Sequence, residues 1–381
     1  MRPFHFHPGP TVLSGAGRSA ELVTKLPDGP VLFVTDGGVR SLGLADACLD
    51  ELEGEGRVVA LFDAVEADPS RETLMAAVDA GRAAEATSVV GFGGGSPMDV
   101  AKLAAYLLGS GDALDAVWGV DKAAGKRLPL ALVPTTAGTG SEATPIAVIT
   151  CEGGVKMGVN ARPLVPDWAV LDAELTLGLP RHVTAATGID AMVHAVEAYT
   201  SARLKNPLSD ALAREALRLL SANLLTACEE PGNRQARSAM LLGAHLAGLA
   251  FANAPVAGVH ALAYPLGGLH HLPHGLSNAL MLRHVLNHNL EAAREDYAEL
   301  APILDPACEP WGTQARAARL IQRLDELAVG TGLALRLRDH GIRFDEAPLL
   351  AREAMKQTRL LVNNPVEIGE ADARRLYEAA W

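Results

Sequence analysis

The length, composition and charge of the chain describe a large, well-packed globular protein. Its 381 residues are enough for two domains. With 49% hydrophobic and 20% charged residues, the chain has the profile of a folded protein, which excludes intrinsic disorder. The formal net charge of −12 argues against nucleic-acid binding, because phosphate recognition depends on clustered lysine and arginine.

Cysteine usage and hydropathy predict a cytoplasmic protein with no membrane partner. The N-terminal stretch MRPFHFHPGPTVLSG has no apolar signal core, and no apolar run is long enough to span a bilayer. The cysteines are widely spaced, with no C-x-x-C pair, which disfavours a disulfide framework or a thiolate zinc site. They are Cys48, Cys151, Cys228 and Cys308.

The first half of the chain alternates β-rich runs with helical segments. Strands are predicted in PVLFVTD (30–36), RVVALFD (57–63) and TSVVGFGGG (87–95), and a later one in LPLALVPTTAGTG. Helices are predicted in SRETLMAAVDAGRAAEA and in SPMDVAKLAAYLL. Strands that alternate with helices favour a parallel α/β sheet.

The second half of the chain has a different texture. From about Pro180 onward, long Ala/Leu-rich segments follow one another with helical periodicity and few β-branched runs. We therefore predict an α/β domain over residues 1–179 and an all-helical domain over residues 180–381.

A glycine-rich loop, GFGGGSPMDVAK, joins a predicted strand to a helix. The glycines from Gly93 to Gly95 allow the backbone to approach a ligand closely and to adopt positive φ. Ser96 is expected as the N-cap, with Pro97 at N1 and Asp99 at N3 in an approximate capping box. The helix N-terminus would then offer free N–H groups to a phosphate. A tight turn without a ligand is the alternative, since neither the usual G-x-G-x-x-G register nor a P-loop is present.

Two further strand ends carry polar side chains. Asp36 ends the strand VLFVTD, where a carboxylate binds a ribose diol and repels a 2′-phosphate, which favours NAD over NADP. The alternative role for Asp36 is an ordinary helix N-cap. In PTTAGTGSEAT, the hydroxyls of Thr135 and Thr136 can donate to phosphate or ribose, although the segment could equally be a loop without a ligand.

Histidine and aspartate spacing raises the possibility of a metal site. Asp190 and His194 are four residues apart and so lie on one face of a predicted helix. His260 and His274 belong to a histidine-rich stretch, and one carboxylate with three imidazoles suits iron(II) or zinc. A single buried histidine is more often a packing or capping residue. A buried carboxylate such as Asp190, however, needs a partner, which a metal with histidine ligands would supply.

The other histidines of the stretch divide by position. His270 and His271 lie between His260 and His274 in the sequence and could line the site. His284 and His288 are spaced i, i+4 and are expected on the surface of a helix or in a structural role.

Four segments together resemble the iron-containing alcohol dehydrogenase family (group III), over nearly the whole chain. They are GFGGGSPMDVAK, PTTAGTGSEAT, GIDAMVHAVEAYTS and VHALAYPLGGLHHLPHGLSNALML. The resemblance implies a dehydroquinate-synthase-like fold, with an α/β dinucleotide-binding domain followed by an all-helical domain that binds metal. It further implies that metal and nicotinamide meet between the two domains, and that the protein is a homodimer.

The resemblance also implies roles for individual residues. The metal, Fe²⁺ or alternatively Zn²⁺, would be held by Asp190, His194, His260 and His274. NAD would lie against the glycine loop, with the pyrophosphate on Gly94, Gly95 and Ser96, and Asp99 in the same motif. Asp36 would take the adenosine ribose, while Thr135, Thr136 and Lys156 (in GGVKMGVN) would line the cofactor cleft.

One position departs from the family pattern. Many members read VHGMAHPLG where this chain reads VHALAYPLG, so Tyr264 occupies the place of a histidine that is a candidate proton shuttle. Tyr264, His271 or a water could carry the proton instead. We select His271 as the relay, because imidazole titrates near neutrality.

The expected reaction interconverts an alcohol with an aldehyde or ketone. A bound metal would act as a Lewis acid on the substrate oxygen, and hydride would pass to the nicotinamide. One alternative is a maleylacetate reductase or hydroxyacid dehydrogenase, which would want Arg or Lys for a carboxylate; the histidine-rich stretch offers only Arg283. A second alternative is a dehydroquinate-synthase-like lyase, which needs a basic cluster that is absent beside the ligands. A non-catalytic metal-binding protein is the third.

Overall fold

The computed structural model describes residues 3–381. These residues form two compact units, one of residues 8–177 and one that combines the residues up to His7 with Gly178–Trp381. The division lies two residues before the predicted one at 179/180. The N-terminal residues belong to the helical unit because the backbone N–H of His7 donates to Asn253 Oδ1 (2.6 Å) and Asn253 Nδ2 donates to His7 O (3.0 Å).

The α/β unit is built on a six-stranded sheet in the order β1-β9-β6-β4-β2-β3, in which every pair is parallel. The predicted parallel α/β fold is thereby confirmed. The strands are β1 (Thr11–Ser14), β2 (Val31–Val34), β3 (Val59–Phe62), β4 (Ser88–Gly93), β6 (Leu130–Pro134) and β9 (Trp168–Leu171). The helices are α1 (Arg18–Glu21), α2 (Gly37–Ser41), α3 (Asp46–Gly54), α4 (Arg71–Ala83) and α5 (Gly95–Ser110).

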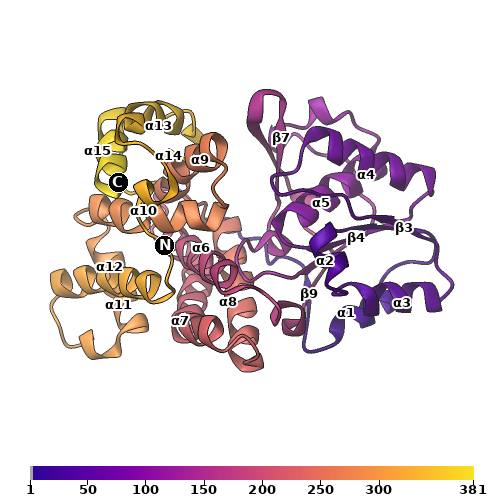
Figure 1. Cartoon of the computed structure of the whole chain (residues 1–381), viewed down its shortest axis with the longest axis horizontal. Helices are drawn as coiled ribbons and strands as arrows, with labels where there is room; N and C mark the ends of the chain where they lie inside the picture. The colour runs from indigo at the N-terminus through magenta and orange to yellow at the C-terminus, as the bar shows by residue number, and fades with distance from the viewer. Residues whose placement is uncertain (1–2) are drawn as a thin grey trace. The chain divides into compact units, whose positions relative to one another are not determined.

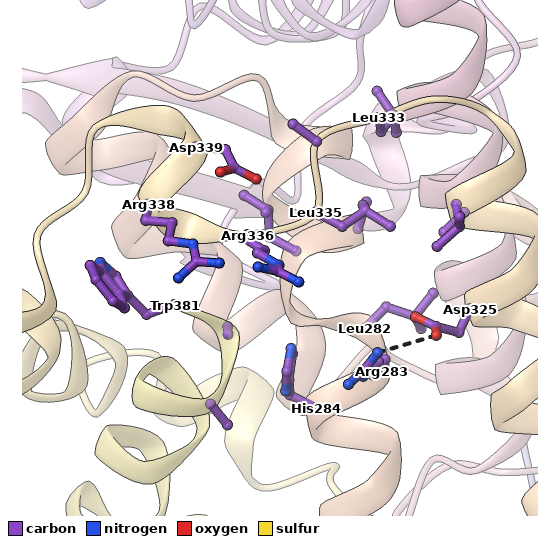
Figure 2. A pocket seen from close by; sticks show the side chains of 17 residues that line it. Leu282, Arg283, His284, Asp325, Leu333, Leu335, Arg336, Arg338, Asp339 and Trp381 are labelled. Carbon is purple, nitrogen blue, oxygen red and sulfur yellow. Dashed lines mark hydrogen bonds and ion pairs between the residues drawn. The ribbon is translucent and has the colours of Figure 1, made fainter.

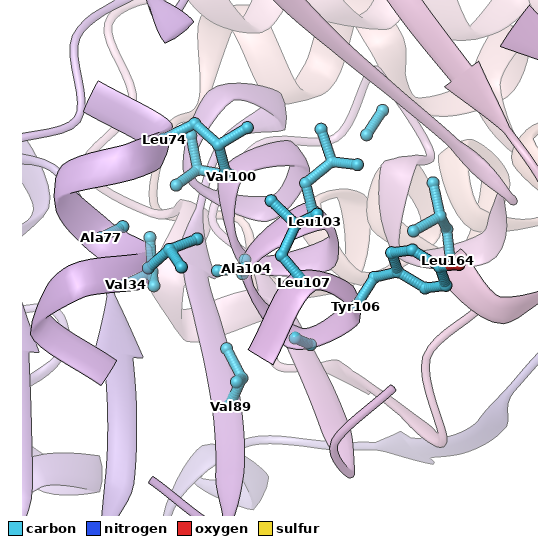
Figure 3. Close-up of a cluster of buried hydrophobic side chains, with 14 of the residues drawn as sticks. Val34, Leu74, Ala77, Val89, Val100, Leu103, Ala104, Tyr106, Leu107 and Leu164 are labelled. Carbon is cyan, nitrogen blue, oxygen red and sulfur yellow. The ribbon is translucent and has the colours of Figure 1, made fainter. Parts of the chain in front are cut away.

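The sheet is covered on both faces, as buried parallel sheets are. On one face, Val34 packs with Leu74 of α4 and Leu103 of α5 (Figure 3). Leu32 belongs to the same cluster. On the other face, Phe33 and its neighbours pack against α3. In Figure 1, α4 and α5 lie above the strands and α1 and α3 below them. Alternate residues of β2 thus face opposite cores, which explains why this strand is an unbroken apolar run.

The carboxyl edge of this sheet is where ligand-binding loops are expected. β2, β4 and β6 are neighbours in the sheet, and the loops that follow them leave from the same edge because the strands are parallel. The chain runs outward from β2 to β3 and then returns to place β4 on the other side of β2. Such a reversal is a topological switch point, the usual place of a nucleotide in doubly wound folds.

A second, three-stranded sheet completes the α/β unit, in the order β5-β8-β7. β7 and β8 form an antiparallel pair, and β5 joins β8 in parallel. The strands are β5 (Gly119–Val120), β7 (Ile146–Cys151) and β8 (Val155–Asn160).

The second unit is all-helical, as predicted. Its central helix is α6 (Arg181–Tyr199), which is buried from Ile189 to Tyr199 on every side and is packed by α7, α8 and α10. A helix buried all round belongs to the interior of a domain. The other helices are α7 (Pro207–Glu229), α8 (Arg234–Asn253), α9 (Gly258–His270), α10 (His274–Asn289), α11 (Arg294–Leu304), α12 (Thr313–Gly330), α13 (Ala347–Ala354), α14 (Thr358–Leu361) and α15 (Glu370–Ala380).

Two consecutive helices of this unit, α8 and α9, are rich in apolar residues, which a membrane span requires together with sufficient length. Across residues 3–381 no single helix is both long and apolar enough to cross a bilayer. α8 and α9 reach that length and composition only as a pair, and they are bent by 106° relative to each other.

Candidate metal and nucleotide sites

Three helices of the second unit bring one carboxylate and three imidazoles together. Asp190 and His194 come from α6, His260 from α9, and His274 is the first residue of α10. Each offers one ligand atom, and these atoms all lie within 4.8 Å of one another. The structure therefore gathers the four residues that the family resemblance implied as metal ligands.

The spacing of these atoms fits a first-row metal ion. Asp190 Oδ1 lies 3.9, 3.8 and 3.7 Å from Nε2 of His194, His260 and His274, respectively. Bonds of about 2.0–2.2 Å in a tetrahedral arrangement separate ligand atoms by roughly 3.3–3.6 Å, so the three distances from Asp190 exceed that range by only a few tenths of an ångström. His260 Nε2 is buried and has no hydrogen-bond partner among the described residues. A metal ion would satisfy that nitrogen, which otherwise carries a desolvation cost.

The electrostatics of Asp190 also suit a ligand. Its carboxyl is buried, and desolvation alone would raise its pKa. The attraction of His194, His274 and His260, helped by a hydrogen bond from Asn278, outweighs the desolvation, so that the pKa of Asp190 is lowered. The carboxylate form, which is the one that binds metal, is thus favoured.

Glu197, one turn after His194 on α6, fixes the orientation of the His260 ring. Its carboxylate is buried and lies 2.7 Å from His260 Nδ1. A carboxylate oxygen accepts, so Nδ1 carries the proton in this contact and the lone pair of Nε2 is left facing Asp190. Glu197 also accepts from the backbone N–H groups of Ala257 (2.9 Å) and Val259 (2.6 Å). It therefore anchors the start of α9, which has no side-chain cap of its own.

Asn278 supports the group from α10. Its side-chain nitrogen donates to Asp190 Oδ1 at 2.6 Å and lies 3.2 Å from His274 Nε2. Sequence reasoning missed both Asn278 and Glu197. Each lies three or four residues after a histidine of the group on the same helix, so helical spacing was the signal that pointed to them.

The region beside His274 contains Tyr264, whose ring meets the His274 ring edge-on with centroids 6.0 Å apart. Nη2 of Arg359 donates to the Tyr264 hydroxyl at 3.4 Å. His270 Nε2 lies 3.1 Å from Glu346 Oε2. His271 is exposed and ends α9 in the left-handed conformation at φ 54°. Tyr264 therefore contacts a proposed metal ligand, His274, more directly than His271 does.

The glycine loop lies at the carboxyl end of β4, but its helix begins earlier than predicted. α5 starts at Gly95 with Gly94 as the N-cap, and no side chain caps it. The expected capping box from Ser96 to Asp99 is therefore wrong. The physical reason is that the Asp99 carboxylate is already engaged, since it accepts from Ser141 Oγ (2.6 Å) and from the backbone N–H of Val148 (2.9 Å).

Gly93 is the one position in the loop where glycine is required by geometry. Its φ is +148°, and a Cβ there would meet Pro97 at 2.8 Å and Asp36 Oδ2 at 3.2 Å. The same contact puts the Asp36 carboxylate beside the loop. Asp36 is also the N-cap of α2, accepting from the backbone N–H of Val39 at 2.9 Å through Oδ1. The capping role and the place beside the loop thus coexist.

The threonine-rich segment runs next to the glycine loop. The backbone N–H of Thr135 donates to Gly93 O at 2.9 Å. A Cβ built on Gly94 would lie 3.8 Å from the Thr136 side chain, and one on Gly95 would lie 3.1 Å from Thr139, so both threonines border the loop.

Lys156 has a different setting, away from these contacts. It lies on β8, and its Nζ pairs with Asp68 Oδ1 at 2.6 Å. Its amine is thus engaged by a carboxylate of the protein itself.

Lys102 is a third buried residue that sequence reasoning missed. Its Nζ donates to Ser141 Oγ (2.7 Å), Thr144 Oγ1 (3.1 Å) and Ile146 O (2.8 Å). Burial lowers the pKa of Lys102 to about 8, against the opposing attraction of Asp99 and Glu142. With Asp99 it ties the first turns of α5 to the segment after β6, and so fixes the glycine loop against the threonine-rich segment.

A large cavity lies elsewhere in the helical unit. It has a volume of about 570 Å³ and is lined in part by Arg283, which pairs with Asp325, and by Arg336 and Trp381 (Figure 2). None of the four clustered ligand residues lines it. Volume alone therefore does not locate the chemistry in this chain.

The α/β unit has a doubly wound sheet with a glycine loop at its switch point, and the helical unit gathers three imidazoles around a buried carboxylate. These features are the ones expected of a metal-dependent dehydrogenase. Comparison with known proteins supplies the family. The model described as iron-containing alcohol dehydrogenase matches residues 9–173, and the model of the C-terminal part of the Fe-containing alcohol dehydrogenase family matches residues 184–381. The chain belongs to the iron-containing alcohol dehydrogenase family and is an oxidoreductase that interconverts alcohols with aldehydes or ketones.

Individual relatives cover nearly the whole chain. Long-chain-alcohol dehydrogenase 1 of Geobacillus thermodenitrificans is 40% identical over 92% of this chain and 89% of its own length. A solved 1,3-propanediol oxidoreductase is 34% identical, with a TM-score of 0.96 over 100% of both chains. A sulfoacetaldehyde reductase from Bifidobacterium kashiwanohense, solved in complex with NAD⁺, is 28% identical with a TM-score of 0.87 over 100% of this chain and 99% of its own. Family membership implies iron and NAD, and these matches give no support to the zinc alternative.

Proposed function

We propose that this protein is an NAD-dependent alcohol dehydrogenase whose iron(II) is held by Asp190, His194, His260 and His274. The observation that carries the proposal is the near-equal separation, 3.7 to 3.9 Å, of one buried carboxylate oxygen from three imidazole nitrogens. When bound, iron would supply Lewis acidity toward an alcohol or carbonyl oxygen.

The chain's own residues would organise the metal group. Glu197 orients His260 and Asn278 holds the carboxylate of Asp190, so both keep the ligands preorganised before the ion arrives. Preorganised ligands raise metal affinity, because less side-chain freedom is lost when the ion binds.

We propose that NAD binds the α/β unit at its carboxyl edge. The backbone of Gly94, Gly95 and Ser96 would receive the pyrophosphate at the N-terminus of α5, where free N–H groups favour an anion. Asp36 would accept from the adenosine ribose and disfavour a 2′-phosphate. Its position beside Gly93 supports that role.

The other candidates for cofactor binding divide in two. Thr135 and Thr136 would flank the phosphate, which their closeness to Gly93 and Gly94 supports. Asp99 and Lys156 are held by protein groups. We therefore propose that Asp99 positions the loop and does not touch the cofactor, and that Lys156 would need to leave Asp68 in order to reach it.

The proton released by the alcohol needs an acceptor that faces the substrate. Tyr264 supports this role better than His271, because its ring packs against that of a proposed metal ligand. We propose Tyr264 as the first relay residue, with His271 as the alternative. Replacing Tyr264 by Phe should lower kcat more than replacing His271 by Ala does, and the reverse order would return the role to His271.

We also propose that the protein is a cytoplasmic homodimer. The four cysteines are free, which is compatible with a reducing compartment. Light scattering of the purified protein at several concentrations tests the dimer, and a monomer throughout would refute it.

The proposed reaction is tested by NADH oxidation with a panel of short aldehydes, with added iron(II) and again after chelation. Iron-dependent turnover is the expected result. A folded protein that binds NADH and iron but turns over no aldehyde would refute the proposal. Repeating the assay with NADPH tests the assignment of Asp36, because equal use of both cofactors would contradict it.

A further inference from the structure

A cationic side chain lies next to the metal group on a segment far away in the sequence. Arg359 belongs to the short helix α14, and its Nη2 lies 3.4 Å from the hydroxyl of Tyr264, whose ring packs edge-on against that of His274. One tyrosine ring therefore separates the guanidinium from a proposed metal ligand.

The segment that carries Arg359 is anchored and not loosely attached. The side chain of Asn363 donates to Arg359 O (3.0 Å) and to Val256 O (3.1 Å). Asn364 accepts from the backbone N–H of Gly258 at 3.3 Å. Both asparagines are buried and bond the start of α9, the helix that also carries His260 and Tyr264. The backbone at Arg359 is thus held beside the start of α9 by buried hydrogen bonds.

The guanidinium of Arg359 has no carboxylate partner among residues 3–381 and is exposed. Some arginines of this unit are paired, for example Arg343 with Asp345 and Arg283 with Asp325. What distinguishes Arg359 is its contact with Tyr264. A guanidinium without a carboxylate partner, carried on an anchored backbone, offers its planar fork of donors to an anion, and bidentate pairing with a carboxylate is the geometry it favours.

We propose that the substrates of this site carry an anionic group, a carboxylate or a sulfonate, at the end remote from the alcohol or aldehyde carbon. Arg359 pairs with that group, and the Tyr264 hydroxyl lies between the anion and the reacting end. The proposal rests on the proposed dehydrogenase function and narrows its substrate class. Arg359 is then a specificity-determining residue that the sequence did not reveal, because 95 residues separate it from Tyr264.

The expected preference is large enough to measure. A charge-assisted pair between guanidinium and carboxylate discriminates against a neutral analogue by about 10- to 100-fold in kcat/KM. The preference should appear mainly in KM, because the anion is held in both the ground state and the transition state.

The test compares 4-oxobutanoate with butanal, which have the same carbon count, and adds sulfoacetaldehyde as the sulfonate arm. The proteins are the iron-loaded wild type, Arg359→Met and Arg359→Lys. The matched control is Arg352→Met, which removes an exposed arginine from the neighbouring helix α13. Iron content and NADH binding are measured for each protein, so that a damaged metal or cofactor site is recognised. A parallel thermal-shift titration with succinate reports anion binding without turnover.

We expect the wild type to prefer the anionic aldehydes about 10-fold or more. Arg359→Met should lose this preference together with the succinate shift, and Arg359→Lys should retain part of both. The control should behave as the wild type. Which of the two anionic aldehydes is favoured separates carboxylate from sulfonate recognition.

Two results would overturn the inference in different ways. Turnover of butanal without any preference for an anionic aldehyde, or a preference that survives in Arg359→Met, removes the anion site and leaves the dehydrogenase intact. Absence of turnover with every aldehyde, in protein that holds iron and binds NADH, removes the dehydrogenase and the substrate class with it.

Discussion

Glu197 offers the sharpest test of the metal group, because it touches one ligand and no expected substrate. Replacing it by Gln keeps the length and shape of the side chain but removes its charge. The carboxylate accepts three hydrogen bonds, from His260 Nδ1 and from the backbone N–H groups of Ala257 and Val259. An amide has one accepting oxygen, so at least one of these buried donors must face the NH₂ group of the new side chain.

The magnitude of the effect has two parts. Loss of the carboxylate that orients a metal-binding histidine lowers metal affinity about 10- to 100-fold, or about 1.4 to 2.7 kcal/mol. A buried donor left without an acceptor costs about 1–3 kcal/mol of folding stability. The apo-protein should therefore unfold at lower denaturant concentration, while the iron-loaded protein loses affinity in addition.

The assay is competition for iron(II) against a chelator of known affinity, followed by denaturant unfolding of the apo-protein. Glu215→Gln, which alters an exposed pair with Arg218 on α7, is the control and should leave iron affinity unchanged. Iron affinity within twofold of the wild type in folded Glu197→Gln would refute the reasoning, because His260 would then be oriented without its carboxylate partner. Glu197→Asp retains the charge on a shorter side chain, so its iron affinity should fall between that of the wild type and that of Glu197→Gln.

Four more changes have defined outcomes. His274→Ala should lower bound iron well below stoichiometric and abolish turnover with it; full iron content would remove His274 from the ligand set. Gly93→Ala is strained by its positive φ and by Pro97, and it should cost roughly 1–3 kcal/mol of unfolding free energy and weaken NADH binding. Gly54→Ala, whose Cβ meets nothing within 4 Å, serves as its control. Lys102→Met should loosen the glycine loop and raise the Kd for NADH, read by fluorescence; an unchanged Kd would contradict this.

The fourth change in this set concerns pH. Burial, reinforced by Arg283, lowers the pKa of His284 from 6.5 to about 4. As the pH falls, the imidazole of His284 is protonated in the unfolded chain before it is protonated in the folded protein. The stability that comes from the neutral ring is therefore fully present above pH 6.5 and is lost as the pH falls through 4. The full pKa shift would correspond to about 3 kcal/mol of unfolding free energy. The actual contribution is smaller, because solvent screens a partly exposed ring. His284→Gln should flatten the unfolding free energy between pH 6.5 and 4 by a measurable part of that amount, and an unchanged pH profile would contradict the assignment.

Local sequence patterns predicted the elements that depend on local chemistry. The unbroken apolar run of β2 reflects burial on both faces of the sheet, and the Ala/Leu-rich segments that form α7 and α8 have helical periodicity, so the parallel sheet and the helical unit could be expected from them. The pairing of Asp190 with His194 followed from one helical turn. The meeting of His260 and His274 with that pair was implied only by family resemblance, since no local rule brings α9 and α10 to α6.

The capping box at Ser96 shows where local rules fail. Ser, Pro and a carboxylate at the right spacing predict a cap, yet Asp99 bonds Ser141 and Val148 instead. A buried lysine explains the choice, because Lys102 donates to Ser141 Oγ and its ammonium lies 3.9 Å from the Asp99 carboxylate. A tertiary network therefore outcompeted a local motif. Its members are 39 and 42 residues apart in sequence, beyond the reach of any cap rule.

The same limit applies to the cation that lies beside Tyr264. The histidine-rich stretch contains a single arginine, Arg283, which pairs with Asp325. The cation that lies beside Tyr264 is Arg359, on the short helix α14. Two buried asparagines, Asn363 and Asn364, bond this segment to the start of α9. Metal ligands are constrained by coordination geometry and therefore keep a recognisable spacing. A specificity residue needs only to reach the far end of the substrate, so any segment that packs nearby can supply it, and only the packed structure shows which one does.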